Sequence, residues 1–171
     1  MRRTVVFLTA ASALMMALAA VPCEAHSLVE FSAPYPEGTI VISQSARRLY
    51  FIVARGEAIE YPVAVAKHGK EWRGFARVDG KYVEPAWSPP DTVKRDHPEL
   101  PDVIPGGSPH NPMGARAITL DRDEVAIHGT TSNMRASVGT AASYGCIRMY
   151  NEDVIDLYDR VQVGANVVMT P

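Results

Sequence analysis

Alternating apolar and polar positions dominate the first half of the chain. Three short runs rich in β-branched and aromatic residues, at 40–42, 49–53 and 61–65, are separated by polar turns. Such runs are typical of strands, and short polar connections join antiparallel neighbours. The pattern therefore predicts three antiparallel strands in this part of the chain.

Two shorter apolar runs follow, at 75–78 and 81–83, on either side of Asp79-Gly80. An Asp-Gly dipeptide readily adopts the positive φ angles that a two-residue hairpin turn requires. We therefore expect a second, short hairpin here.

The last third of the chain combines strands with a helix. Runs at 117–120, 125–127 and 167–169 predict three further strands. Between them, apolar residues recur at helical spacing over about 152–161, after Asn151, which is a good helix cap. Together these elements predict a mainly β domain, a sandwich or barrel-like fold with one clear helix.

A long segment rich in proline interrupts this pattern. Residues 84–114, the proline-rich loop, contain eight prolines and cannot form a regular helix or a central strand. Loops of this length within a domain are usually functional or disordered. Trp87, Val103 and Ile104 supply apolar anchors, which favours an ordered loop lining a cleft over a disordered one.

The N-terminus has the composition of a secretory signal peptide. Two arginines precede an apolar run over residues 5–20, and small residues at 23–25 offer a cleavage site. The apolar run is shorter than the ~20 residues that a membrane-spanning helix needs. A lipid anchor on Cys23 is the alternative, but Pro22 stands where such a signal has a small residue. We expect residues 1–25 to be removed and the protein to be secreted, with a periplasm as the preferred destination.

The remaining residues, 26–171, have the length of a single domain with a substantial core, spanning about 39–169. The full sequence carries 17 basic and 19 acidic side chains, for a net charge of −2, and has no basic tract. This composition argues against a nucleic-acid partner. We expect a monomer without stable membrane insertion.

One cysteine, Cys146, remains after the expected cleavage and has no internal disulfide partner. It stands between Gly145 and Ile147-Arg148, a setting that suits a reactive thiol, although an inert buried thiol is the alternative. A thiol nucleophile needs a neighbouring base. Of the five histidines, His128 alone is expected at a strand end beside a glycine, and on this pattern a structural role for it is equally compatible.

A metal site built on Cys146 and His128 is a weak alternative. The two residues lack the Cys-x-x-Cys or His-x-x-x-His spacing that zinc sites usually show. We therefore expect neither a metal nor another cofactor.

The surroundings of these two residues resemble a known signature. Residues 127–130 and 143–149, which place His128 and Cys146 eighteen positions apart, are similar to the motifs of L,D-transpeptidase catalytic domains, the YkuD-like family of ErfK/YbiS type. The resemblance covers about 39–169. It extends, in the order of the family, to Trp87-Ser88-Pro89-Pro90, Gly106-Gly107, Asn111 to Ala117, and Asn151-Glu152-Asp153-Val154.

This resemblance implies a secreted cysteine acyltransferase acting on peptidoglycan stem tetrapeptides. Cys146 would attack the carbonyl of the third stem residue, release the terminal D-alanine and form a thioester, which an amine acceptor then resolves. His128 would serve as general acid and base, oriented by the backbone carbonyl of Gly129. The backbone N–H groups of Tyr144, Gly145 and Cys146 would stabilise the oxyanion, although Gly145 is also compatible with an ordinary turn.

Four further residues are candidates for substrate binding. Arg148 suits a substrate carboxylate or support of the cysteine loop, but a structural salt bridge is an equal alternative. The resemblance adds Ser143, Trp87 and Asn111. The expected partners are therefore peptidoglycan stem peptides and an amine acceptor, which is either a stem peptide or a protein.

The sequence departs from the family pattern at two places. Tyr144 stands where many relatives have histidine, so a second imidazole is missing and the assignment of His128 as base gains weight. Residues 71–74, Glu-Trp-Arg-Gly, replace a common Thr-Pro-x-Gly segment near the cleft. The second departure leaves details of substrate binding open without affecting the fold.

Two other functions stay open. An L,D-carboxypeptidase would differ only in admitting water to the thioester. A wall-binding module with an inactive site is the other alternative, but the presence of both Cys146 and His128 argues against it.

Overall fold

The computed structural model describes residues 26–171, and the expected signal peptide lies outside this range. Strands dominate the described chain, which confirms the mainly β fold. The strands are β1 (Ser27–Glu30), β2 (Ile40–Ser43), β3 (Arg48–Ala54), β4 (Glu57–Pro62), β5 (Val65–Ala66), β6 (Gly74–Val83), β7 (Arg116–Leu120), β8 (Ala126–His128), β9 (Ala141–Ser143), β10 (Ile147–Arg148) and β11 (Asn166–Thr170). The helical segments are α1 (Asp91–Asp96), the 3₁₀ turn η1 (Ser132–Ser137) and α2 (Asn151–Arg160).

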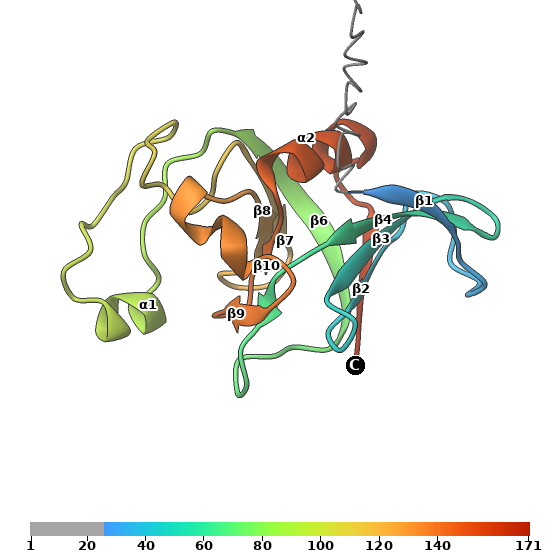
Figure 1. Cartoon of the computed structure of the whole chain (residues 1–171), viewed down its shortest axis with the longest axis horizontal. Helices are drawn as coiled ribbons and strands as arrows, with labels where there is room; N and C mark the ends of the chain where they lie inside the picture. The colour runs from blue at the N-terminus through green and yellow to red at the C-terminus, as the bar shows by residue number, and fades with distance from the viewer. Residues whose placement is uncertain (1–25) are drawn as a thin grey trace, which may run out of the picture.

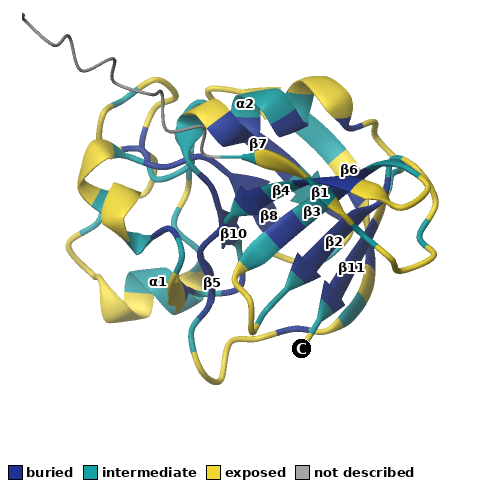
Figure 2. Cartoon of the chain, turned by 45° about the vertical axis from the view of Figure 1, so that its right-hand side comes forward, coloured by how far each residue is buried: buried dark blue, intermediate teal, exposed yellow. Residues whose placement is uncertain are grey.

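Nine strands form one sheet in the order β1-β4-β3-β2-β11-β6-β7-β8-β10, and β5 pairs with β9 beside it. The meander predicted for the first half is present as β2, β3 and β4, which pair antiparallel, but β4 begins four residues before the predicted run at 61–65 and ends at Pro62. The last strand, β11, lies in the middle of the sheet, parallel to β2 and antiparallel to β6 (Figure 2). The C-terminal strand therefore joins the two halves of the sheet.

The second predicted hairpin is wrong. Residues 74–83 form one long strand, β6, which crosses the middle of the molecule (Figure 1). Its first half pairs with β11 and its second half with β7, with a register shift between Val78 and Gly80. The Asp79-Gly80 dipeptide thus forms a bulge, which bends a strand and does not reverse it. A Cβ atom at Gly80 would lie 2.8 Å from the Tyr82 hydroxyl, so a larger residue there would displace the Tyr82 side chain.

The helix predicted near the C-terminus is confirmed, but Asn151 is not its cap. The helix α2 begins at Asn151, and Tyr150 occupies the cap position without a side-chain cap hydrogen bond. Val154 and Leu157 are buried and face the main core, where α2 packs against β7 and β8. The buried faces of the sheet and of α2 appear in dark blue in Figure 2.

The proline-rich loop is ordered, and it contains a helix that the sequence argued against. The six residues of α1 lie between Pro89-Pro90 and Pro98, so no proline falls inside the helix. Pro90 occupies the cap position, where a missing N–H costs little. The base of the loop is closed by two hydrogen bonds between the backbones of Trp87 and Ile104. The loop lies to one side of the sheet, in yellow-green at the left of Figure 1.

None of the helices between residues 26 and 171 combines the length and the apolar character required to cross a bilayer.

Candidate active site

His128 ends strand β8, and Cys146 immediately precedes the neighbouring strand β10. The strands β8 and β10 are parallel, with Ile127 opposite Ile147 and His128 opposite Arg148. Both isoleucines are fully buried in the main core. Because side chains alternate along a strand, Cys146, His128 and Arg148 project to the other face. All three line one cavity of about 380 Å³, together with Tyr144 and with Trp87 and other residues of the proline-rich loop.

The imidazole of His128 is buried and held by its backbone. It is 4 % exposed, and its Nδ1 lies 2.8 Å from the carbonyl oxygen of Gly129. A proton on Nδ1 satisfies that carbonyl and leaves Nε2 as the basic nitrogen. Burial, assisted by the Arg148 cation, lowers the pKa of His128 to about 4, against the opposing effect of backbone hydrogen bonds at Gly129 and Pro112. The imidazole is therefore neutral at pH 7 and able to accept a proton.

The Cys146 thiol is also neutral at rest. Burial raises its pKa, which the Ala126 backbone and the Arg148 cation lower in part and the Glu124 carboxylate raises further. The sulfur lies 3.4 Å from the Glu124 carbonyl oxygen, an acceptor that suits a thiol proton. The structure thus combines a protonated thiol with a neutral imidazole and does not favour a thiolate–imidazolium pair.

A tight turn over residues 143–146, the cysteine loop, presents the sulfur. Gly145 has a φ of 137°, a conformation that residues with a Cβ atom rarely adopt. The Ser143 hydroxyl donates to the Cys146 carbonyl at 2.5 Å and accepts from the Gly145 N–H at 3.2 Å. Among the three N–H groups considered for the oxyanion, that of Gly145 therefore has a partner within the loop.

Trp72 stabilises the cysteine loop through a hydrogen bond to its backbone. Its ring N–H donates to the Gly145 carbonyl at 3.1 Å in a buried position, and the Arg122 guanidinium lies 4.6 Å from the centre of its ring. Trp72 belongs to the segment in which the sequence departs from the family pattern. This contact could not be predicted from the sequence, because Trp72 and Gly145 lie 73 positions apart.

Arg148 is a buried cation that lines the cavity. Its side chain donates to the Ser137 hydroxyl at 2.7 Å, while its Nε has no hydrogen-bond partner. Among residues 26–171, no carboxylate lies within ion-pair distance of it, so the salt-bridge alternative finds no support. Burial lowers the pKa of Arg148 from its ordinary high value, and the neighbouring Cys146 opposes this shift.

The other three substrate candidates occupy different positions. Trp87 lines the cavity as expected. Ser143 also borders it, but its hydroxyl is used inside the cysteine loop. Asn111 does not line the cavity: it is 2 % exposed and donates to the carbonyls of Pro85, Ile104 and Pro105. We therefore assign Asn111 to holding the base of the proline-rich loop.

The proline-rich loop is joined to the cysteine loop by a polar cluster that the sequence did not indicate. The Tyr144 hydroxyl donates to Asp96 at 2.6 Å, and Lys67 lies 3.8 Å from the same carboxylate. The Lys67 ammonium is also 3.5 Å from the centre of the Tyr144 ring. Asp96 is the last residue of α1, so this cluster fixes one end of that helix above the cavity. We call Lys67, Asp96 and Tyr144 the loop tether.

A second cavity also borders Cys146 and shares Trp87 and Glu124 with the first. It has a volume of about 640 Å³, and its charged lining residues are Asp91, Asp123, Glu124 and Arg122. Cys146 therefore borders both cavities. Within residues 26–171, no three His, Cys, Asp or Glu side chains gather closely enough to hold a metal ion.

Solved structures share this fold. An L,D-transpeptidase from Mycobacterium smegmatis superposes with a TM-score of 0.62 at 18 % identity, over 78 % of this chain and 58 % of that one. A Brucella melitensis structure, described as a probable carnitine operon oxidoreductase, is 37 % identical with a TM-score of 0.57, over 88 % of this chain and 96 % of that one. The G-x-G-x-x-G fingerprint of dinucleotide-binding enzymes does not occur in the present sequence.

Sequence relatives give the same family. The probable L,D-transpeptidase ErfK/SrfK of Escherichia coli is 35 % identical over 75 % of this chain, and YbiS of the same species is 33 % identical over 77 %. The matched segments cover 42 % and 44 % of those relatives, so this chain corresponds to less than half of their length. A family model of the L,D-transpeptidase catalytic domain matches residues 37–169. The chain therefore belongs to the YkuD family of L,D-transpeptidase catalytic domains.

Proposed function

We propose that this protein is a secreted L,D-transpeptidase that acts on peptidoglycan stem tetrapeptides, with Cys146 as nucleophile and His128 as general base. One observation carries the proposal: the thiol and a neutral, backbone-oriented imidazole line the same cavity in a domain of this family. The cavity is bounded largely by apolar side chains, which favours charge stabilisation by the few polar groups within it.

Acylation begins from the neutral pair. The Cys146 sulfur attacks the carbonyl carbon of the third stem residue while Nε2 of His128 takes the thiol proton. Proton transfer accompanies attack because neither charged form is favoured at rest. When the tetrahedral intermediate collapses, the C–N bond breaks and the imidazolium gives its proton to the departing D-alanine. A thioester on Cys146 and a neutral His128 remain.

The second half of the reaction returns the enzyme to its starting state. An acceptor amine attacks the thioester carbonyl and loses a proton to His128. The C–S bond then breaks, and the sulfur recovers the proton from the imidazolium. The product is a new amide bond, so the reaction requires no cofactor.

The oxyanion needs donors that are free at the moment of attack. We assign this task to the backbone N–H groups of Tyr144 and Cys146, because that of Gly145 already donates to Ser143. The hydrogen bond from Trp72 to the Gly145 carbonyl polarises the peptide that carries the Cys146 N–H. Loss of one oxyanion donor typically costs ~3 kcal/mol of transition-state stabilisation.

Arg148 is proposed to bind a carboxylate of the acyl donor. A buried guanidinium without an ion-pair partner retains donors that a planar carboxylate can satisfy. Its charge also favours the developing thiolate. Trp87 supplies an apolar wall to the same cavity.

Two cavities that both border Cys146 favour acyl transfer over hydrolysis. A transferase must admit an acceptor as well as a donor, and the second cavity adds space next to Cys146. Its three acidic residues, Asp91, Asp123 and Glu124, outnumber the one basic residue, Arg122, which suits an acceptor that carries an ammonium group. An L,D-carboxypeptidase, which would use water in place of the amine, is the alternative.

Incubation of the protein with disaccharide tetrapeptides, followed by mass spectrometry, tests the proposal. We expect a cross-linked dimer and an acyl-enzyme intermediate with the wild type, and neither with Cys146→Ala. His128→Ala should slow acylation by roughly 10²–10⁴-fold, the usual contribution of general-base catalysis. A product trimmed to tripeptide without dimer would identify the carboxypeptidase. Full activity of a folded Cys146→Ala variant would refute the mechanism.

A further inference from the structure

The Asn151 side chain joins two loops that border the active site. Its Oδ1 accepts from the backbone N–H of Ala115 at 3.1 Å and from that of Thr130 at 3.0 Å. Its Nδ2 donates to the Thr130 carbonyl at 2.9 Å. Asn151 begins the helix α2, yet its amide makes no capping bond to that helix. Its hydrogen-bonding capacity is therefore directed to the segment that follows His128.

The packing around this amide is close enough to require glycine on both sides. A Cβ atom at Gly129 would lie 2.2 Å from the Asn151 Oδ1, and one at Gly114 would lie 2.3 Å from the same oxygen. Heavy atoms cannot approach to such distances, so any larger residue at either position would displace the amide. The Asn151 amide thus packs tightly between Gly114 and Gly129.

The bond to Thr130 acts on the peptide that orients the catalytic imidazole. The Thr130 N–H and the Gly129 C=O belong to the same peptide unit. That unit donates to Asn151 at one end and faces Nδ1 of His128 at the other, at 2.8 Å. Hydrogen bonds in such a chain polarise one another, and the Asn151 contact fixes the plane in which the carbonyl lies.

From this arrangement we infer that Asn151 is a positioning residue for His128. By holding the Gly129–Thr130 peptide, it keeps the Nδ1–H tautomer of His128 and directs Nε2 toward the cavity. The inference rests on the proposed function in one respect, namely that His128 is the base. The position of the hydrogen-bonded chain itself does not depend on that function.

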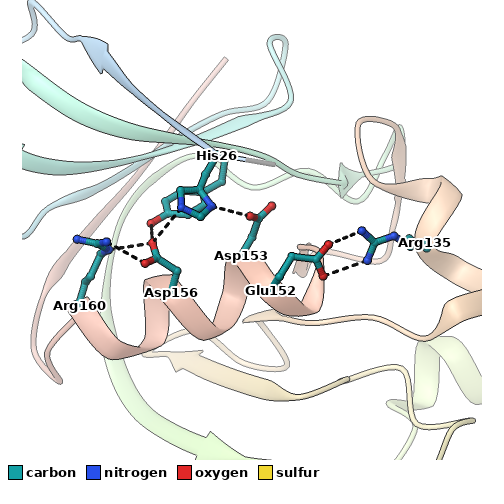
Figure 3. A network of polar contacts seen from close by, with 7 residues as sticks. His26, Arg135, Glu152, Asp153, Asp156 and Arg160 are labelled. Carbon is teal, nitrogen blue, oxygen red and sulfur yellow. Dashed lines mark hydrogen bonds and ion pairs between the residues drawn. The ribbon is translucent and has the colours of Figure 1, made fainter. Parts of the chain in front are cut away.

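Neighbouring residues of α2 provide a matched control. Glu152 pairs with Arg135, while Asp153 contacts His26 and Asp156 pairs with Arg160 (Figure 3). The Glu152 pair is exposed and makes no contact with the Gly129–Thr130 peptide. The variant Glu152→Gln therefore perturbs the start of the same helix without touching the hydrogen-bonded chain.

Nitrogen-15 NMR of the His128 ring measures the tautomer directly, with assignment by comparison with His128→Gln. We expect a single Nδ1–H tautomer in the wild type and in Glu152→Gln. Asn151→Leu, of similar shape but without polar atoms, should show mixed tautomers and a fall in acylation rate of roughly 10- to 100-fold. Asn151→Asp retains the acceptor for the Thr130 N–H but loses the donor to the Thr130 carbonyl, so it should keep the Nδ1–H tautomer and recover part of the rate.

A folded Asn151→Leu variant with a single Nδ1–H tautomer and the wild-type rate would overturn the inference. If that variant does not fold, Asn151→Asp decides, because loss of the Nδ1–H tautomer from a folded Asp variant contradicts the role assigned to the Oδ1 acceptor. The NMR spectra report the tautomer of His128 whether or not the protein is catalytically active. A wild-type protein that forms no acyl-enzyme would refute the proposed function and leave the NMR comparison as the test of Asn151.

Discussion

Burial shifts the pKa values of the two reacting groups in opposite directions. It raises the pKa of Cys146 and lowers that of His128, because water no longer solvates either charged form. Arg148 reinforces the effect on the imidazole and partly offsets it on the thiol. The thiol and the imidazole therefore both stay uncharged in the resting site, which limits unwanted reactions of a thiolate.

The buried imidazole makes stability depend on pH. The pKa of His128 falls from an ordinary 6.5 to about 4 on folding, so the unfolded chain binds more protons between these values. The free energy of unfolding therefore decreases as pH falls through this window, by about 3 kcal/mol in total from this group. Urea unfolding at several pH values between 7 and 4 should show this loss in the wild type and its absence in His128→Gln.

The test compares how the free energy of unfolding changes with pH in the wild type and in His128→Gln. Asp153, whose pKa burial raises, contributes with the opposite sign but does so equally in both. Parallel stability curves for wild type and His128→Gln would show that the imidazole is not held neutral in the fold.

Single residues were predictable where the motif itself contains them. Cys146, His128 and Gly129 lie within the two motifs on which the resemblance rests. They lie at the ends of two adjacent strands, β8 and β10. The resemblance includes Asn151 and Tyr144, but the contacts of Asn151, Trp72 and the loop tether were not predictable, because each joins residues far apart in the sequence. Asn151 is the clearest example, since its type and position suggested a helix cap and its side chain is used elsewhere.

At the scale of elements, the proline-rich loop is held over the cavity by few contacts. Its base is closed by the Trp87–Ile104 backbone pair and by Asn111. Its outer part, including α1, reaches the body of the protein through the loop tether. A loop anchored in this way can move without disturbing the sheet.

Tyr144→Phe tests the loop tether. The change removes the hydroxyl that donates to Asp96 and retains the ring that Lys67 contacts. We expect faster amide hydrogen exchange in α1 and little change in the global melting temperature, because the core is unaffected. Tyr35→Phe, in the pocket at the opposite edge of the sheet, is the control. Unaltered exchange in α1 would mean that other contacts hold the loop.

Helices and strands were predicted well where the local sequence pattern determines them, and poorly where pairing with distant strands determines them. The meander β2–β3–β4 and the helix α2 follow from periodicity alone. The Asp79-Gly80 bulge could not be predicted in this way, because Asp-Gly is common both in tight turns and in bulges. The strand β6 stays extended because its two halves pair with different strands, β11 and β7. The short helix α1 was missed because the prolines around it dominate the composition.

At the scale of the whole molecule, β11 ties the sheet together. It is hydrogen-bonded to β2 on one side and to β6 on the other, and Val167, Val168 and Met169 are all buried. The pairing of residues 40–43 with 167–170 links the two ends of the domain. Stability should therefore be sensitive to the last few residues of the chain.

Val167→Ala measures this sensitivity. Val167 is fully buried in the main core, so removal of two methyl groups should lower the free energy of unfolding by about 2 kcal/mol. Val163→Ala, at a side chain that is 60 % exposed, should change it by less than about 0.5 kcal/mol. Equal effects in urea unfolding would show that β11 is not a central strand in solution.

The central place of β11 also bears on when the domain can fold. A chain that emerges from its N-terminus delivers β2, β3 and β4 early, but the strand that connects them to β6 arrives last. Until then the two parts of the sheet present unpaired edges and cannot close around a common core. If the protein is exported in extended form, as the proposed function requires, this order of synthesis delays compaction until β11 has crossed the membrane.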